Sequence, residues 1–144
     1  MRHEVAYFNV RQGESLDLTV YTAIRFLLRP ARYGIAILGW TLSREMDNYD
    51  AWLIKTNEFG EPLWNRTYSG LGIDQPFSII QTRSDDFAIV GVTRSNDKSS
   101  TDSGVDVWLV YIDKNGEELW NYHIGGVDDD WAYSIIEAEK RKEE

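Results

Sequence analysis

The chain has 144 residues, a formal net charge of −9, two histidines and no cysteine. This length suits one domain with its own core, and the absence of cysteine excludes a disulfide framework, a cysteine-based zinc site and a thiol nucleophile. The mean hydropathy of −0.44 predicts a soluble protein, and the isoelectric point near 4.7 argues against a nucleic-acid partner, which requires a basic surface.

The first 18 residues contain no apolar run that could act as a secretory signal. Glu4, Arg11 and Glu14 interrupt them, whereas a signal peptide needs about 7–15 apolar residues behind a basic start. By default we expect a cytoplasmic protein without membrane insertion. Residues 1–18 are interpreted as an N-terminal segment that can supply an edge strand.

Residues 19–28 admit two interpretations. The sequence of residues 20–24, VYTAI, resembles that of residues 132–136, AYSII, which favours a first strand of a repeated unit. A helix that begins at Asp17 and ends before Pro30 fits the same apolar spacing. Both interpretations stay open at this point.

The most informative feature of the sequence is an internal repeat. Residues 50–80 align without a gap to residues 106–136, with 13 identities in 31 positions, where average composition would give about two. Upstream, residues 36–41 match residues 88–93 at an offset shorter by four. The difference falls in the polar stretch 95–104, where an insertion fits a surface loop. The chain is therefore a duplication.

Each repeat is predicted to form four short antiparallel strands. Runs rich in β-forming residues cover 77–82, 87–93, 105–112 and 118–124, and polar turn residues separate them. Asp113–Gly116 is a tight turn in which the Asn-Gly pair suits a positive φ. Four short strands in some 52–56 residues, repeated, are typical of β-propeller blades.

The repeated residues resemble a known family. Their pattern, D-x-W-L-I/V … D/N-x-x-G-E-x-L-W-N … G … D … F/Y-S-I-I … A-I-L/V-G-x-T, is similar to the propeller repeats of long surface and extracellular proteins of archaea and bacteria. Asp113–Trp120 also resembles the tryptophan-docking motif of quinoprotein-type propellers, which Asn57–Trp64 matches less well. The resemblance implies a propeller architecture and admits an extracellular or surface location. It implies no particular activity, because propellers host many.

We therefore predict an all-β fold of about two propeller-like blades, each a sheet of four antiparallel strands. Blade 1 covers residues 19–73 and blade 2 residues 74–129, residues 130–138 form the first strand of a further or shared blade, and residues 139–144 form a charged tail. Closed propellers need about four to eight blades. We expect a homo-oligomer of two or three copies, or association with other propeller blades. The alternative is a monomer in which residues 130–138 fold back beside residues 5–10.

Residues that recur at the repeat offset are assigned to structure. We expect the recurring tryptophans to be largely buried and related by the repeat, and the recurring aspartates to anchor the connection between blades. These structural residues are Trp52, Trp64, Trp108, Trp120, Gly60, Gly116, Asp74 and Asp130. Trp40 and Trp131 have no tryptophan counterpart and are the candidates for a ligand site or an interface.

Acidic loops supply the candidates for a calcium site. Carboxylate and amide oxygens suit Ca²⁺, but no loop has the EF-hand pattern, and short polar side chains also close turns. We therefore expect no metal. The calcium candidates considered are Asp47, Asn48, Asp50, Asp102, Asp106 and Asp128.

Catalytic motifs are missing from the sequence. His3 lies near the terminus and His123 corresponds to Thr67 in the other repeat, and no nucleophile elbow, zinc-protease motif or phosphate loop occurs. We expect no catalytic residue and no cofactor. The sequence thus favours a non-catalytic, propeller-type interaction or structural module that self-associates or completes a larger propeller. The alternative is an oligomeric propeller that binds a carbohydrate, a cofactor or a metal in a channel between subunits, with enzymatic activity there.

Overall fold

The computed structural model describes residues 20–25, 34–43, 48–70, 72–95 and 104–138. Within these ranges the chain forms strands and no helix. The strands are β1 (Val20–Arg25), β2 (Ile35–Ser43), β3 (Asn48–Thr56), β4 (Pro62–Tyr68), β5 (Gly72–Gln81), β6 (Phe87–Ser95), β7 (Val105–Ile112) and β8 (Glu118–Ile124). The all-β fold predicted from the sequence is confirmed for this part of the chain.

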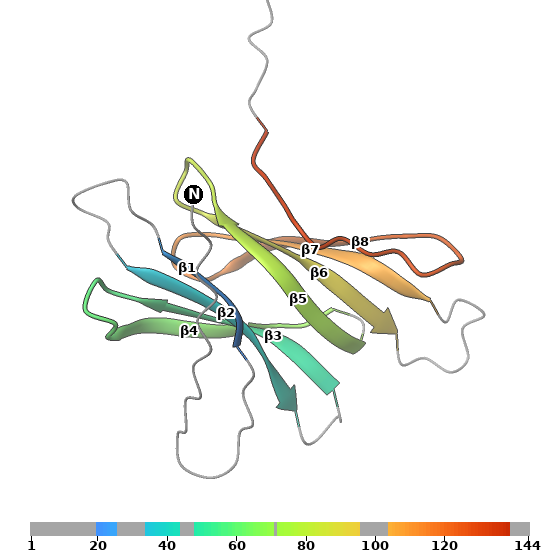
Figure 1. Cartoon of the computed structure of the whole chain (residues 1–144), viewed down its shortest axis with the longest axis horizontal. Coiled ribbons are helices and arrows are strands. Elements are labelled where there is room, and N and C mark those ends of the chain that lie inside the picture. The colour runs from blue at the N-terminus through green and yellow to red at the C-terminus, as the bar shows by residue number, and fades with distance from the viewer. Residues whose placement is uncertain (1–19, 26–33, 44–47, 71, 96–103, 139–144) are drawn as a thin grey trace, which may run out of the picture.

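The strands form two antiparallel sheets, in the orders β1-β2-β3-β4 and β5-β6-β7-β8 (Figure 1). We call them the first and the second sheet. Each strand pairs with its neighbour in the chain, as expected. β5 crosses the first sheet and lies against β3, β2 and β1. Of the two interpretations of residues 19–28, the strand is confirmed over residues 20–25 and the helix is wrong there. The segments predicted for residues 1–18 and 139–144 lie outside the described residues.

The two sheets repeat each other in backbone register. Each has one bulge in its first hairpin and one in its third hairpin. The four bulges lie at Val20/Thr22, Pro76/Ser78, Lys55/Thr56 and Tyr111/Ile112. Equivalent bulges are 56 residues apart, which is the offset of the sequence repeat. Because a bulge adds one residue to one strand and redirects the side chains beyond it, its recurrence means that equivalent residues face the same way in both sheets.

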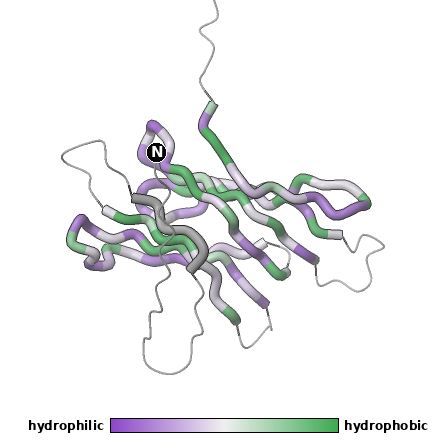
Figure 2. The backbone as a smooth tube through the Cα atoms, viewed as in Figure 1, coloured by the Kyte–Doolittle hydropathy of each residue, from purple (hydrophilic) through white to green (hydrophobic). Residues whose placement is uncertain are grey.

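The hydrophobic core lies between the two sheets. Leu38 and Leu53 face it from the first sheet, and Ile79, Ile89 and Val110 face it from the second. Hydrophobic and hydrophilic residues alternate along the strands (Figure 2), as expected of strands with one face on a core. β6 departs from this alternation because Ala88, Val90 and Val92 are also buried. The second sheet therefore has apolar residues on both faces.

Candidate interaction surface

The two repeats touch where β4 lies against the turn between β7 and β8. The ring of Trp64 covers Gly116, and Arg66 Nη2 lies 3.1 Å from Glu117 Oε1. The Tyr68 hydroxyl donates a hydrogen bond of 2.8 Å to the carbonyl oxygen of Gly116. Burial raises the pKa of Tyr68 well above its usual range, so this hydroxyl stays protonated and remains a donor. These contacts define how one sheet stacks on the next.

The turn under Trp64 has a counterpart that nothing covers. Gly116 has a φ of 90° and Gly60, in the turn between β3 and β4, has a φ of 82°. Asp113 accepts two backbone N–H bonds within its turn, and Asn57 does the same in the other turn. The two turns therefore match in conformation. They differ only in what lies above them.

This difference predicts unequal effects of one substitution. Gly116→Ala and Gly60→Ala should each destabilise by roughly 1–2 kcal/mol, because a Cβ is disfavoured at positive φ. At Gly116 the new Cβ would also lie 3.0 Å from Cε3 of Trp64, whereas at Gly60 it meets no atom within 4 Å. We expect Gly116→Ala to lose about 1–3 kcal/mol more than Gly60→Ala in chemical denaturation. Equal losses would contradict the contact with Trp64.

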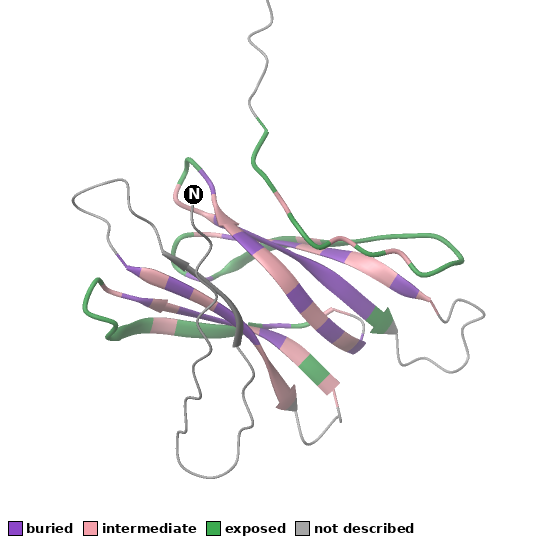
Figure 3. Cartoon of the chain, in the orientation of Figure 1, coloured by how far each residue is buried: buried purple, intermediate pink, exposed green. Residues whose placement is uncertain are grey.

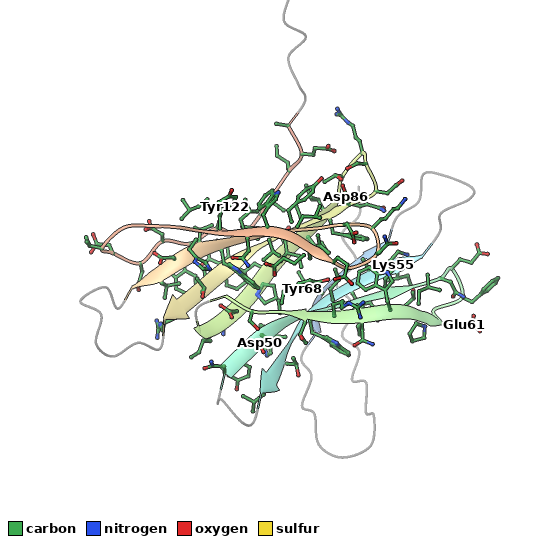
Figure 4. All side chains as sticks on the ribbon, turned by 180° about the vertical axis from the view of Figure 1, so that it is seen from behind. Asp50, Lys55, Glu61, Tyr68, Asp86 and Tyr122 are labelled. Atoms are coloured by element: carbon green, nitrogen blue, oxygen red, sulfur yellow. The ribbon has the colours of Figure 1, made fainter. Side chains whose placement is uncertain are left out.

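One face is covered in the first sheet and open in the second. In the first sheet this face is buried against the second sheet, and Tyr68 at its β4 edge is only 4% exposed. The equivalent residue of the second sheet, Ile124 in β8, is 55% exposed. Figure 4 shows Tyr68 between the sheets and Tyr122 on the outer side of β8. We call this outer apolar face, towards β8, the open face; its exposed members are Trp120, Tyr122 and Ile124.

Residues 127–138 run along the other side of the open face. The backbone N–H of Asp130 donates to the carbonyl oxygen of Val105 at 2.6 Å, and the rings of Trp131 and Tyr133 pack on Phe77 of β5. Near the end of this segment Glu137 Oε2 accepts the backbone N–H of Arg83. The segment pairs with no strand among the described residues, and most of it is exposed (Figure 3).

The start of this segment repeats the start of β5. Asp74 Oδ2 accepts the backbone N–H of Gly70 at 2.6 Å. Asp130 Oδ2 accepts the backbone N–H of Gly126 at 2.8 Å. Both pairs are related by the 56-residue offset. Residues 130–138 thus begin over the second sheet with the same hydrogen bond that opens β5 over the first sheet.

Asp74 is fully buried at this connection, which predicts a pH dependence. Burial is the largest influence and raises the pKa of Asp74, although hydrogen bonds from Thr93 and Gly70 oppose it. A raised pKa in the folded state means that stability falls as pH rises from the unfolded pKa, about 3.9, through the folded pKa. Asp74→Asn keeps an oxygen acceptor without the charge. We expect its stability, relative to the unaltered chain, to improve from acid to neutral pH in urea denaturation; a constant difference would contradict a shifted carboxyl group.

The recurring tryptophans differ in burial. Trp108 is 0% exposed in the core, as predicted, and Trp64 is half-buried against Phe87. Trp52 is also half-buried. The predicted burial of Trp120 is wrong: this residue is 38% exposed and stacks on Tyr111. The reason is that the second sheet covers Trp64, while no described residue covers the equivalent position on the open face.

The other candidates are dispersed. Trp40 in β2 makes an edge contact with Tyr49, whereas Trp131 is 46% exposed over the second sheet. The described residues contain no group of three acidic or histidine side chains that could hold a metal. Of the calcium candidates, Asp47 and Asp102 lie outside the described residues, and the others are Asn48 and Asp50 in β3, Asp106 in β7 and Asp128 after β8. Sequence reasoning did not identify Tyr122 and Ile124, whose exposure depends on the stacking order.

Comparison with known proteins assigns no family. The chain matches no family model, and a search of curated proteins finds no significant match. No helix in the described part of the chain is long and apolar enough to cross a membrane. Function is therefore inferred from the open face and the segment beside it.

Proposed function

We propose that this chain is a non-catalytic structural and interaction module of propeller-type blades, which joins further blades through the open face of its second sheet. The observation that carries this proposal is the contrast between Tyr68, buried at 4% exposure, and its equivalent Ile124, exposed at 55%. Both occupy the same position in their sheets. One has a sheet stacked upon it and the other has none among the described residues.

The propeller interpretation is supported by how the sheets are built and stacked. Each has four antiparallel strands that are neighbours in the chain, and the second lies face to face on the first. A propeller repeats such sheets around a central axis. The hydrogen bond of Asp130 begins a third unit in the manner of the second. These features favour a repeating stack over a closed two-sheet sandwich.

An interaction role is supported by the chemistry of the open face. Trp120, Tyr122 and Ile124 are exposed side by side along β8, and Val127, Tyr133 and Ile136 are exposed on the adjacent segment. Contiguous apolar surface of this kind marks a protein–protein contact. Aromatic residues are also enriched at the centres of interfaces.

Removal of residues 130–144 tests the proposal. We expect the unaltered chain to have a solution mass by light scattering that is a multiple of 16.7 kDa. The shortened chain should lose this association while its far-ultraviolet circular dichroism retains the β signal. An unaltered chain that is a well-folded monomer at micromolar concentration would contradict the proposed function.

A further inference from the structure

The contact between the two repeats also leaves one unmatched half at each end of the stack. Trp64 covers Gly116 inside the chain. Its equivalent Trp120 is exposed on the open face, and Gly60, the equivalent of Gly116, has no atom within 4 Å of its Cβ position. Trp120 and Gly60 are therefore the two halves of a contact that the described chain makes only once.

The outer face of the first sheet provides the complementary surface. In the second sheet, Trp108 and Ile89 face the core and are fully buried. Their equivalents in the first sheet, Trp52 and Ile37, are only half-buried. The first sheet thus presents outward the same positions with which the second sheet covers it. A second copy of the chain carries both surfaces needed to continue the stack.

The C-terminal segment matches a strand of the fold. Residues 132–137, AYSIIE, are equivalent to residues 76–81 of β5, PFSIIQ, and to the six residues of β1, VYTAIR. The central Ser-Ile-Ile is shared by the segment and β5 but not by β1. Ile79, the middle isoleucine of β5, is 1% exposed in the core. β1 has Ala23 at this position, so the segment has the larger core residue.

We propose that a second copy of this chain covers the open face, and that residues 132–137 of one copy replace β1 on the β2 edge of the next. This inference rests on the proposed function and names its partner and register. By the register of the β1–β2 and β5–β6 pairs, Ile135 lies opposite Ile37 and Ile136 opposite Ala36 of the next copy. Trp120 then covers Gly60 of that copy. The contact is head-to-tail, which closes into a ring when the rotation permits.

A matched pair of surface variants tests which face is covered. Ile124 and Leu119 are equally exposed in β8, at 55% and 54%. Leu63, the equivalent of Leu119, stays 60% exposed although the first sheet is covered, so the proposed contact leaves Leu119 in solvent. We expect Ile124→Lys to weaken self-association at least tenfold in sedimentation velocity and Leu119→Lys to leave it unchanged. Equal effects of the two variants would overturn the inference.

Engineered disulfides test the register, because the natural chain has no cysteine. A chain with Ala36→Cys is mixed with a chain of different tag carrying Ile136→Cys, or Ser134→Cys as the control. Directly opposite residues of paired strands lie within disulfide reach, whereas diagonal ones lie about 7–8 Å apart. We expect a mixed covalent dimer with Ile136→Cys and little with Ser134→Cys.

The outcomes separate this inference from the proposed function. Self-association with no preference for the Ile136→Cys pair would overturn the strand replacement and leave the interaction module standing. A monomer at all concentrations, with no cross-link from either pair, would overturn both. Cross-linking of the Ile136→Cys pair, together with loss of association in Ile124→Lys, would support both.

Discussion

Replacing Trp108 by alanine should lower the free energy of unfolding by about 3–5 kcal/mol. Its side chain is 0% exposed and belongs to the core between the sheets. Truncation therefore removes a large buried apolar surface and leaves a cavity that the surrounding strands fill only in part. The measurement is urea denaturation followed by circular dichroism.

Trp52→Ala is the matched control for this prediction. Trp52 has the same repeat position in β3, but it is half-buried and its Nε1 donates to Asn65 Oδ1 at 3.2 Å. We expect Trp52→Ala to lose about half as much stability, because roughly half as much apolar surface is removed from a buried site. If Trp108→Ala leaves the melting temperature unchanged, Trp108 is not part of the core.

Replacing Tyr68 by alanine should have a similarly large effect. Tyr68 is 4% exposed at the edge of the core, and its hydroxyl bonds to Gly116 of the other sheet at 2.8 Å. We expect Tyr68→Ala to lose about 3–5 kcal/mol through the lost packing. Tyr68→Phe keeps the ring and should lose only about 1–3 kcal/mol, since it leaves the Gly116 carbonyl without its partner.

The comparison of the two Tyr68 variants separates packing from hydrogen bonding. Both are measured by chemical denaturation, and Ile124→Ala serves as the control at the equivalent position. Because Ile124 is exposed, we expect its truncation to change monomer stability by less than about 1 kcal/mol. A loss for Ile124→Ala as large as that for Tyr68→Ala would mean that the open face is covered within the monomer.

Much of the fold can be predicted from the repeat alone. Two independent copies of each strand and turn are visible in the sequence, so chance apolar patterns are filtered out. The turn at Asp113–Gly116 is an example, because Asn57–Gly60 repeats its capping residue and its glycine. Consecutive strands joined by short turns pair as antiparallel neighbours, which is the order found in both sheets.

Residues 20–25 show where local pattern is insufficient. Their apolar spacing fits a strand and a helix, because short apolar runs satisfy both periods. Pairing with β2 decides for the strand. That partner begins at Ile35, beyond the window in which periodicity is assessed. The likeness to residues 132–136 is therefore a better indicator than the spacing within the segment.

The burial of Trp120 shows why the candidate surface was harder to predict. Trp64 and Trp120 are equivalent in sequence and differ in exposure only because a further sheet covers one of them. Stacking order is a property of the assembly of sheets and not of any single repeat. The contact of Trp64 with Gly116, and the open position above Gly60, depend on that order in the same way.

Sedimentation equilibrium of the unaltered chain over a range of concentrations tests the central claim most directly. If the open face joins a second copy, the mean mass rises with concentration above the 16.7 kDa of one chain, because head-to-tail association is governed by mass action. A mean mass of 16.7 kDa at every concentration up to the millimolar range, from a chain that unfolds cooperatively, would contradict it.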